Sequence, residues 1–170
     1  LTLFDSESID IPYENAPIKK VKLLSRETYK PLGNTPLYDA VVNTLERLSE
    51  KVDVKKESRP KVIVAIMTDG EENDSKKHDE KCLRDLIKQL TAEGNYTFVF
   101  LGANQDTFAN ATKWGIMIGN TVNFSQDSVR NSFAAMSKSS VNLANAGNLT
   151  NTSNFFEGVE EVAKDDDKVA

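Results

Sequence analysis

The sequence predicts one doubly wound α/β domain with a mainly parallel sheet, one antiparallel edge strand and helices on both faces. From Leu37 onward, helical and strand-like patterns alternate, which is typical of parallel strands joined by crossover helices. Several strands are continuous apolar runs, the pattern of strands covered on both faces. A length of 170 residues with 39% hydrophobic content suits a single buried core.

The N-terminal part is expected to supply the antiparallel edge. Residues 1–4 form a short apolar run, and residues 18–24 alternate partly between apolar and charged side chains. Pro12, Asn15 and Pro17 lie between these runs and indicate a connection. We therefore expect two short strands here.

The clearest helix begins near Leu37. Asn34-Thr35-Pro36 marks its start, with the Thr35 hydroxyl as a cap and Pro36 at the first helical position, where no amide donor is needed. Apolar residues then recur at helical spacing and predict one buried face. That face consists of Leu37, Ala40, Val41, Leu45, Leu48 and Val52.

Alternating elements continue to about residue 147. Strands are expected at residues 62–67, 96–101 and 121–124. Helices are expected from about residue 79 to a stop at Gly94, at 106–114, and from 129 to about 147. The second helix should bury Cys82, Leu83, Leu86, Ile87 and Leu90, and the last helix Val129, Phe133, Met136 and Leu143.

This pattern divides the chain into two segments. Residues 1–147 are expected to form the domain. Residues 148–170 are expected to form a polar linker, a short docking helix and an acidic tail. The docking helix would contain Phe155, Phe156, Val159 and Val162.

Composition narrows the classes of partner. The chain has 21 Lys and Arg against 26 Asp and Glu, a formal net charge of -5, and no basic stripe interleaved with aromatic residues. Phosphate binding needs a basic face, so no nucleic-acid partner is expected. No apolar run approaches the roughly 18 residues that a membrane span needs. The single cysteine leaves no internal disulfide and fits a reducing compartment.

Two stretches stand where a parallel sheet places its ligands, next to the carboxyl ends of the strands. One is Met67-Thr68-Asp69-Gly70-Glu71-Glu72-Asn73, directly after an apolar strand, and the other is Gly33-Asn34-Thr35-Pro36-Leu37-Tyr38-Asp39-Ala40, at the helix start. These motifs and their spacing resemble the von Willebrand factor A family, and residues 98–103 and 128–133 resemble its bacterial and phage members. The resemblance covers about residues 1–146. It implies a Rossmann-like fold in a cytoplasmic or virion-associated protein.

The resemblance implies a metal-ion-dependent adhesion site for Mg²⁺, or for Mn²⁺ or Ca²⁺ in its place. Thr35 matches the hydroxyl ligand of the family's second loop, and Asp69 matches the carboxylate of its third loop, which often acts through a water. Mg²⁺ prefers six oxygen ligands and keeps several waters, so an acidic side chain of a partner protein can complete its shell. The candidate residues for contacting the partner or supporting the ligands are Asn34, Asp39, Gly70 and Glu71.

One motif of the family is not matched. Its first loop carries Asp-x-Ser-x-Ser, whereas Asp5-Ser6-Glu7-Ser8-Ile9 has Glu7 and Ile9 at the serine positions. We therefore interpret residues 1–4 as the family's second strand and residues 18–24 as its edge neighbour. The first strand, the first helix and three ligands are then missing, so we expect the natural chain to extend N-terminally. A site reduced to two ligands leaves loss of the metal as an alternative.

Each candidate residue also has a structural interpretation. Thr35 could act only as a helix cap, and Asp69 could be a turn residue before Gly70. Asp39 is expected to orient the neighbouring loop or to favour the helix dipole. The remaining candidates are expected at positions without a role in binding. Glu71, Glu72 and Asp74 are expected in a solvated loop, His78 at the surface and Cys82 in the core.

The leading hypothesis is a non-catalytic protein-binding module that uses a divalent cation. The first alternative is a structural subunit of a larger assembly, such as a phage particle, with a degenerate metal site. The second is a metal-dependent hydrolase that uses Asp69. Against that enzyme, the sequence shows no second positioned acid or base, no glycine-rich phosphate loop and no Walker-type lysine.

Overall fold

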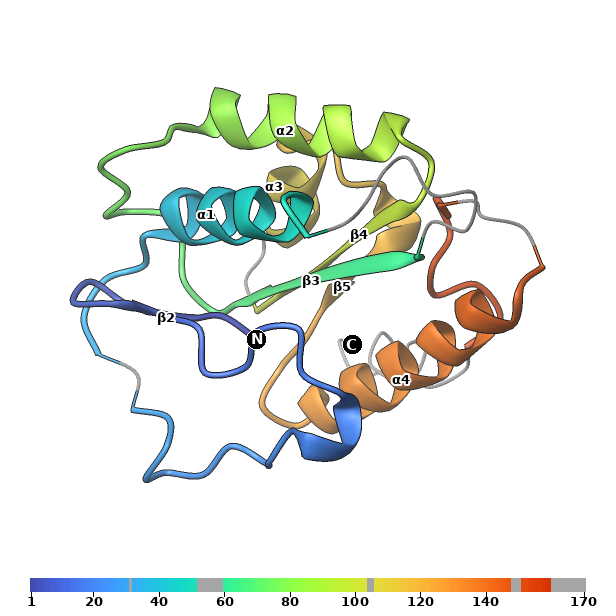
Figure 1. The fold of residues 1–170 in the computed structure, drawn as a ribbon, viewed down its shortest axis with the longest axis horizontal. Coiled ribbons are helices and arrows are strands. Elements are labelled where there is room, and N and C mark those ends of the chain that lie inside the picture. Colours follow the sequence, from blue (N-terminus) through green and yellow to red (C-terminus); the bar gives the residue numbers. More distant parts are fainter. Residues whose placement is uncertain (31, 52–59, 104–105, 148–150, 160–170) are drawn as a thin grey trace, which may run out of the picture.

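The computed structural model describes residues 1–30, 32–51, 60–103, 106–147 and 151–159. A three-stranded parallel sheet lies at its centre, in the order β3 (Val62–Thr68), β4 (Tyr96–Gly102) and β5 (Thr121–Asn123). The helices of the described residues are α1 (Leu37–Ser49), α2 (Glu80–Ala92), α3 (Thr107–Lys113) and α4 (Val129–Asn145). One face of the sheet packs against α1, α2 and α3, and α4 lies on the other (Figure 1). This arrangement is the doubly wound, Rossmann-like α/β fold that the alternating patterns predict.

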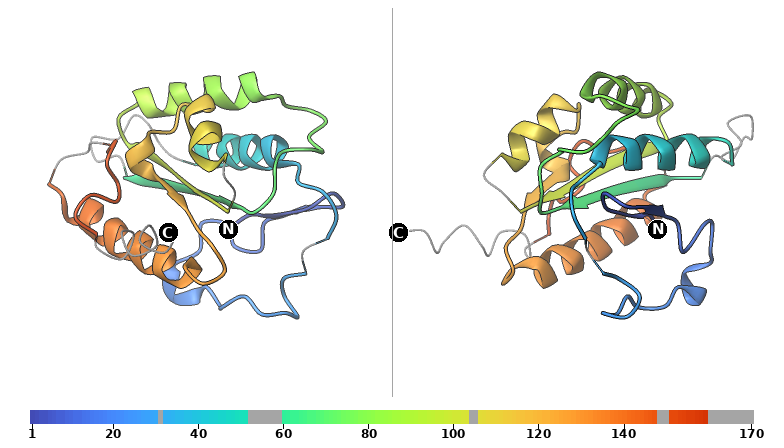
Figure 2. Two further views of the ribbon diagram at one scale, coloured as in Figure 1. Left: turned by 180° about the vertical axis from the view of Figure 1, so that it is seen from behind. Right: turned by 90° about the vertical axis from the view of Figure 1, so that its left-hand side faces the viewer.

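The central strand β4 divides the core into two layers. All of its residues are buried, because it pairs with β3 on one side and β5 on the other. Tyr96, Phe98 and Phe100 point into the layer formed with α1, α2 and α3. Val99 and Leu101 point into the layer on the α4 side. Two further views show α4 and α1 on opposite sides of the sheet (Figure 2).

The prediction that β3 is covered on both faces is wrong. Val62, Val64 and Ile66 pack into the α1–α3 layer, but on the other face Ala65 is exposed and Met67 is 37% exposed. The apolar cluster on the α4 side instead covers the neighbouring strands, through Val99, Leu101 and Val122. Ile63 is the one residue of β3 in this cluster.

The predicted antiparallel edge strand is also wrong. β1 (Leu3–Phe4) pairs with β2 (Ile9–Asp10) in a separate two-stranded sheet. A tight turn makes this pairing local, because the Asp5 carboxylate accepts hydrogen bonds from the amides of Glu7 and Ser8. Residues 18–24 form no strand and begin with a 3-10 turn, η1 (Ile18–Lys20). Their apolar side chains find no sheet to pack against, and Leu23 is 95% exposed.

The ends of α2 follow the predicted signals. The Asp79 carboxylate accepts a hydrogen bond from the Cys82 amide at 2.8 Å, which caps the first turn. Gly94 follows the helix with a φ of +83°, the left-handed conformation that ends many helices. The prediction that Cys82 is buried is wrong, because Leu83, Ile87 and Leu90 form the inward face and Cys82 is exposed.

The last helix packs differently from the prediction. Phe133 is 48% exposed, and the buried residues of α4 are the small Ser132, Ala135 and Ser139. Large apolar side chains reach this layer from the C-terminal segment, residues 151–159, which buries Phe155, Phe156 and Val159. This segment forms a turn rather than the predicted helix. Val162, residues 148–150 and the acidic tail lie outside the described residues.

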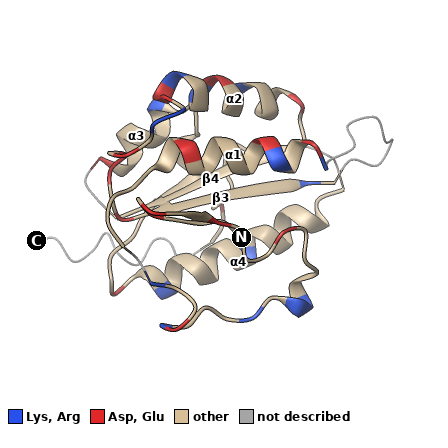
Figure 3. Ribbon diagram, turned by 60° about the vertical axis from the view of Figure 1, so that its left-hand side comes forward, with Lys and Arg blue, Asp and Glu red and all other residues tan. Residues whose placement is uncertain are grey.

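The three strands of the central sheet carry no charged residue. The coloured ribbon of Figure 3 shows Lys, Arg, Asp and Glu on the surrounding segments. No helix in the described part of the chain is long and apolar enough to cross a membrane. Charged side chains that could bind a ligand therefore lie in the loops at the ends of these strands.

Candidate functional site

The two motif stretches meet at the carboxyl end of β3. A Cβ placed on Gly70 would lie 2.8 Å from the Thr35 hydroxyl oxygen, so the two loops are in contact. The Thr35 amide donates to the Asn73 side-chain oxygen at 2.8 Å, and the Asn73 amide donates to the Thr35 carbonyl oxygen at 3.2 Å. The fold thus brings residue 35 beside the turn that contains Asp69.

The side-chain oxygens of Thr35 and Asp69 have no hydrogen-bond partner in the part of the chain that the structure describes. Thr35 is half-buried and Asp69 is exposed. Among the described residues, neither side chain takes part in a hydrogen bond or an ion pair. The prediction that Thr35 caps its helix is wrong, because Pro36 occupies the cap position of α1 and no side chain of that residue closes the first turn.

The neighbouring candidates lie around this pair. The turn itself is held by Thr68, whose hydroxyl donates to the Gly70 carbonyl oxygen at 2.9 Å and lies 3.1 Å from the Gly70 amide. Asn34 and Glu71 are exposed, where a partner could contact them. A Cβ on Gly33 would collide with the Ser6 side chain, so the β1–β2 turn adds a hydroxyl that sequence analysis did not assign to the site.

Glu72 closes the start of α1 and is not the solvated residue that the sequence predicts. Its carboxylate accepts from the Tyr38 amide at 2.9 Å, which is one of the free donors of the helix start. The same carboxylate accepts from the amides of Asp74 and Ser75 at 2.9 and 2.7 Å, and from the Ser75 hydroxyl at 2.7 Å. No sequence pattern indicates this role, because the capped helix lies far from Glu72 along the chain.

Asp39 holds the other end of the same loop. Its carboxylate, 12% exposed, accepts from the amides of Lys76, Lys77 and His78 at 2.8, 3.1 and 2.8 Å. The His78 ring nitrogen Nδ1 lies 3.0 Å from the same carboxylate, and the side chain remains 23% exposed at the surface. Burial raises the pKa of Asp39, but these hydrogen bonds outweigh burial and hold the pKa below its ordinary value.

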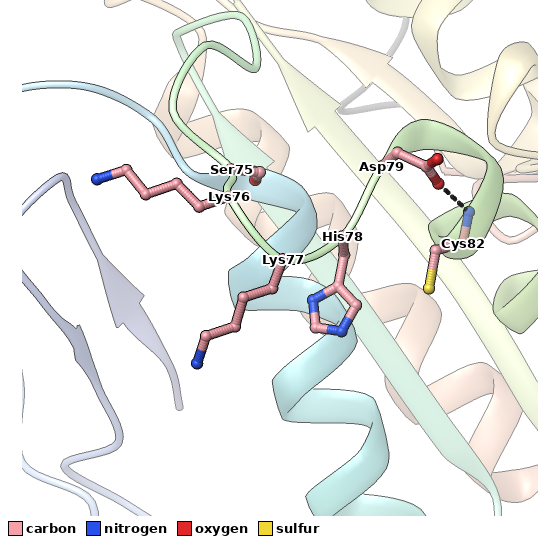
Figure 4. A pocket seen from close by; sticks show the side chains of 6 residues that line it. All are labelled: Ser75, Lys76, Lys77, His78, Asp79 and Cys82. Atoms are coloured by element: carbon pink, nitrogen blue, oxygen red, sulfur yellow. Dashed lines mark hydrogen bonds between the residues drawn. The ribbon is translucent and has the colours of Figure 1, made fainter.

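A shallow pocket lies on the outer side of this loop. It is lined by Ser75, Lys76, Lys77, His78, Asp79 and Cys82. In Figure 4 the Lys76 and Lys77 side chains extend away from the protein, whereas the His78 ring lies over α1. The Asp79 carboxylate is engaged with the Cys82 amide. The side chains of Ser75, His78 and Asp79 are thus engaged in hydrogen bonds within the protein.

A residue can bind a cation here only if its side-chain oxygen atoms are not already used in other contacts. Among the described residues, the Thr35 hydroxyl and the Asp69 carboxylate accept or donate no hydrogen bond, and oxygens of these kinds fit a hard ion that keeps several waters. The carboxylates of Asp39 and Glu72 are occupied by backbone amides and do not fit. Within the described ranges, no group of three or more His, Cys, Asp or Glu residues is placed to bind a metal. A site here would therefore rest on Thr35, Asp69 and water.

Comparison with known proteins gives no match to a family model, a curated protein or a solved structure. The residues themselves therefore provide the basis for a function. They combine a turn held by Thr68, two side-chain oxygens that make no hydrogen bond among the described residues, and exposed polar neighbours at one rim of the sheet.

Proposed function

We propose that the chain is a non-catalytic protein-binding module that uses a divalent cation, Mg²⁺ or in its place Mn²⁺ or Ca²⁺. Thr35 and Asp69 would hold the cation, and waters would complete its shell. A bound cation supplies an electrophilic centre that can accept a carboxylate of a partner protein. The observation that carries this proposal is the contact between the Thr35 hydroxyl and Gly70, immediately beside Asp69.

The contrast between the acidic residues supports the proposal. The carboxylates of Asp39 and Glu72 in this region each accept several hydrogen bonds. The Asp69 carboxylate accepts no hydrogen bond within the described residues and is exposed to solvent. An exposed carboxylate that accepts no hydrogen bond from the described residues is available to a cation without loss of such a bond.

A structural subunit with a degenerate metal site is the second candidate. The small number of ligands favours it, because two protein oxygens hold Mg²⁺ weakly and no cluster of metal-binding side chains adds to them in the described part. In such a subunit the same loops would support an interface and bind no cation.

A magnesium titration followed by amide NMR separates the two candidates. We expect Mg²⁺ to shift the amide signals of residues 33–36 and 68–73 in a saturable way. Asp69→Asn should weaken the affinity at least about tenfold, because it replaces a charged carboxylate oxygen by a neutral amide oxygen, and Thr35→Val should weaken it as well, because it removes the hydroxyl. Asp74→Asn is the matched control, since it removes the same charge from the same loop.

Three results would overturn the proposal. Shifts that are unsaturable or scattered over the surface would favour the structural subunit. Equal affinities in the Asp69→Asn and Asp74→Asn variants would show that charge alone attracts the ion. Turnover of phosphate esters that disappears with Asp69→Asn would favour a metal-dependent hydrolase instead.

A further inference from the structure

The loop between β3 and α2 is held by an unusual number of backbone contacts to two carboxylates. The amides of residues 74–78 are consecutive, and each donates to Glu72 or to Asp39. Glu72 belongs to the loop itself, whereas Asp39 lies on α1. The Asp39 side chain therefore ties the backbone of residues 76–78 to α1.

The contacts form a series along the start of α1. Asn73 bonds to the backbone of Thr35 in both directions. Glu72 accepts from the Tyr38 amide, and the Asp39 amide donates to the Ser75 hydroxyl at 3.1 Å. The Asp39 side chain then binds the amides of residues 76–78. Residues 72–78 are thus fixed against residues 35–39, and Asp69 enters the same loop just before them.

A loop fixed in this way restricts the distance between Thr35 and Asp69. Hydrogen bonds from amides to a carboxylate are stronger than bonds between neutral groups. The Asp39 carboxylate is nearly buried, so little water is present to replace them. Without Asp39, the loop would be held at Thr35 and Tyr38 but released over residues 76–78. Metal ligands depend on such supporting contacts for their orientation.

We infer that Asp39 is a positioning residue, which fixes the loop of Asp69 against α1 and so favours the small cation Mg²⁺ over the larger Ca²⁺. This inference rests on the proposed function. Mg²⁺ demands a near-octahedral shell at short distances, whereas Ca²⁺ tolerates irregular shells and longer distances. Loosening the loop therefore costs Mg²⁺ binding more than it costs Ca²⁺ binding.

The test compares Asp39→Asn with Asp74→Asn in the full chain. Both changes remove one negative charge from this region, but only the first replaces an acceptor of three backbone amides. We expect Asp39→Asn to weaken Mg²⁺ binding about tenfold, to weaken Ca²⁺ binding less, and to speed hydrogen exchange at residues 76–78 in the metal-free protein. Asp74→Asn should leave the ratio of the two affinities unchanged.

A second variant covers the case in which Asp39→Asn fails to fold. Asp39→Glu keeps the charge but moves the carboxylate by one methylene, and it should reduce the preference for Mg²⁺ in the same direction. An unchanged ratio of affinities in a folded Asp39 variant would overturn the inference. If Asp69→Asn weakens Mg²⁺ binding in that experiment, the proposed function survives. If Asp69→Asn has no effect, the proposed function itself is wrong.

Discussion

Two aspartates at the same end of the sheet differ in what surrounds them. Asp39 is nearly buried and accepts three backbone amides and a histidine ring. Asp69 is exposed and has no partner among the described residues. A carboxylate saturated with donors stabilises the fold, whereas an unsaturated one is available to a ligand. The two roles follow from environment and not from residue type.

The pH dependence of stability should report on Asp39. Its pKa in the folded protein lies below the ordinary value of 3.8, so the ionised form stabilises the folded state. This contribution is complete above the unfolded pKa and is lost as the pH falls through the folded one. Asp39→Asn should lower the free energy of unfolding by about 1 to 3 kcal/mol near neutral pH, and the difference from wild type should narrow below pH 3.8.

Urea unfolding of both proteins over a series of pH values measures that difference. Other carboxylates titrate in the same range, but they affect wild type and variant alike and cancel in the comparison. A difference that stays constant through the acid range would show that the Asp39 charge contributes nothing to stability.

At the level of elements, α1 and the loop after β3 supply hydrogen-bond partners to each other. The helix begins after Pro36 without a side-chain cap of its own. The loop supplies the acceptors, with the Glu72 carboxylate on the Tyr38 amide and the Ser75 hydroxyl on the Asp39 amide. In return the helix supplies Asp39 to the loop amides. Neither element reaches its observed conformation by local sequence alone.

Glu72→Gln tests this mutual capping. The substitution weakens the acceptor of the Tyr38, Asp74 and Ser75 amides, and loss of a helix cap costs about 1 to 2 kcal/mol. We expect a loss of that size in urea unfolding and faster hydrogen exchange at Tyr38. Glu71→Gln, at the exposed neighbouring residue, should change stability by less than about 0.5 kcal/mol. Equal effects of the two changes would contradict the capping role.

At the level of the whole molecule, the C-terminal segment belongs to the core. Residues 151–159 cross the layer on the α4 side and bury Phe155, Phe156 and Val159 there. Asn120, which is itself buried, links this segment to the sheet. Its side-chain amide donates to the carbonyl oxygens of Phe98 and Thr152 at 3.1 and 2.7 Å, and its oxygen accepts from the Phe155 amide at 2.8 Å.

Asn120→Ala should therefore release the C-terminal segment. It removes three hydrogen bonds and leaves buried backbone groups without partners, at a cost of about 1 to 3 kcal/mol. We expect chymotrypsin to cleave after Phe155 or Phe156 much faster in the native variant than in wild type. Asn142→Ala, at an exposed residue of α4, should leave the cleavage rate unchanged. Resistance equal to that of wild type would mean that apolar packing alone holds the segment.

Periodicity was sufficient to predict the alternating elements from α1 to α4, because repeated apolar spacing specifies a helix or a strand locally. The predicted strand and helix ends also located two motifs, and the resemblance of those motifs to a known family indicated Thr35 and Asp69. The sequence could not reveal that residues 18–24 lack a partner strand, that Phe133 is displaced from the core, or that Glu72 and Asp39 hold one loop. Those features depend on which distant segments come into contact, and hydrogen bonds between residues far apart in the chain leave no periodic signal. The order of elements was therefore determined locally, whereas the arrangement of the site was decided by tertiary packing.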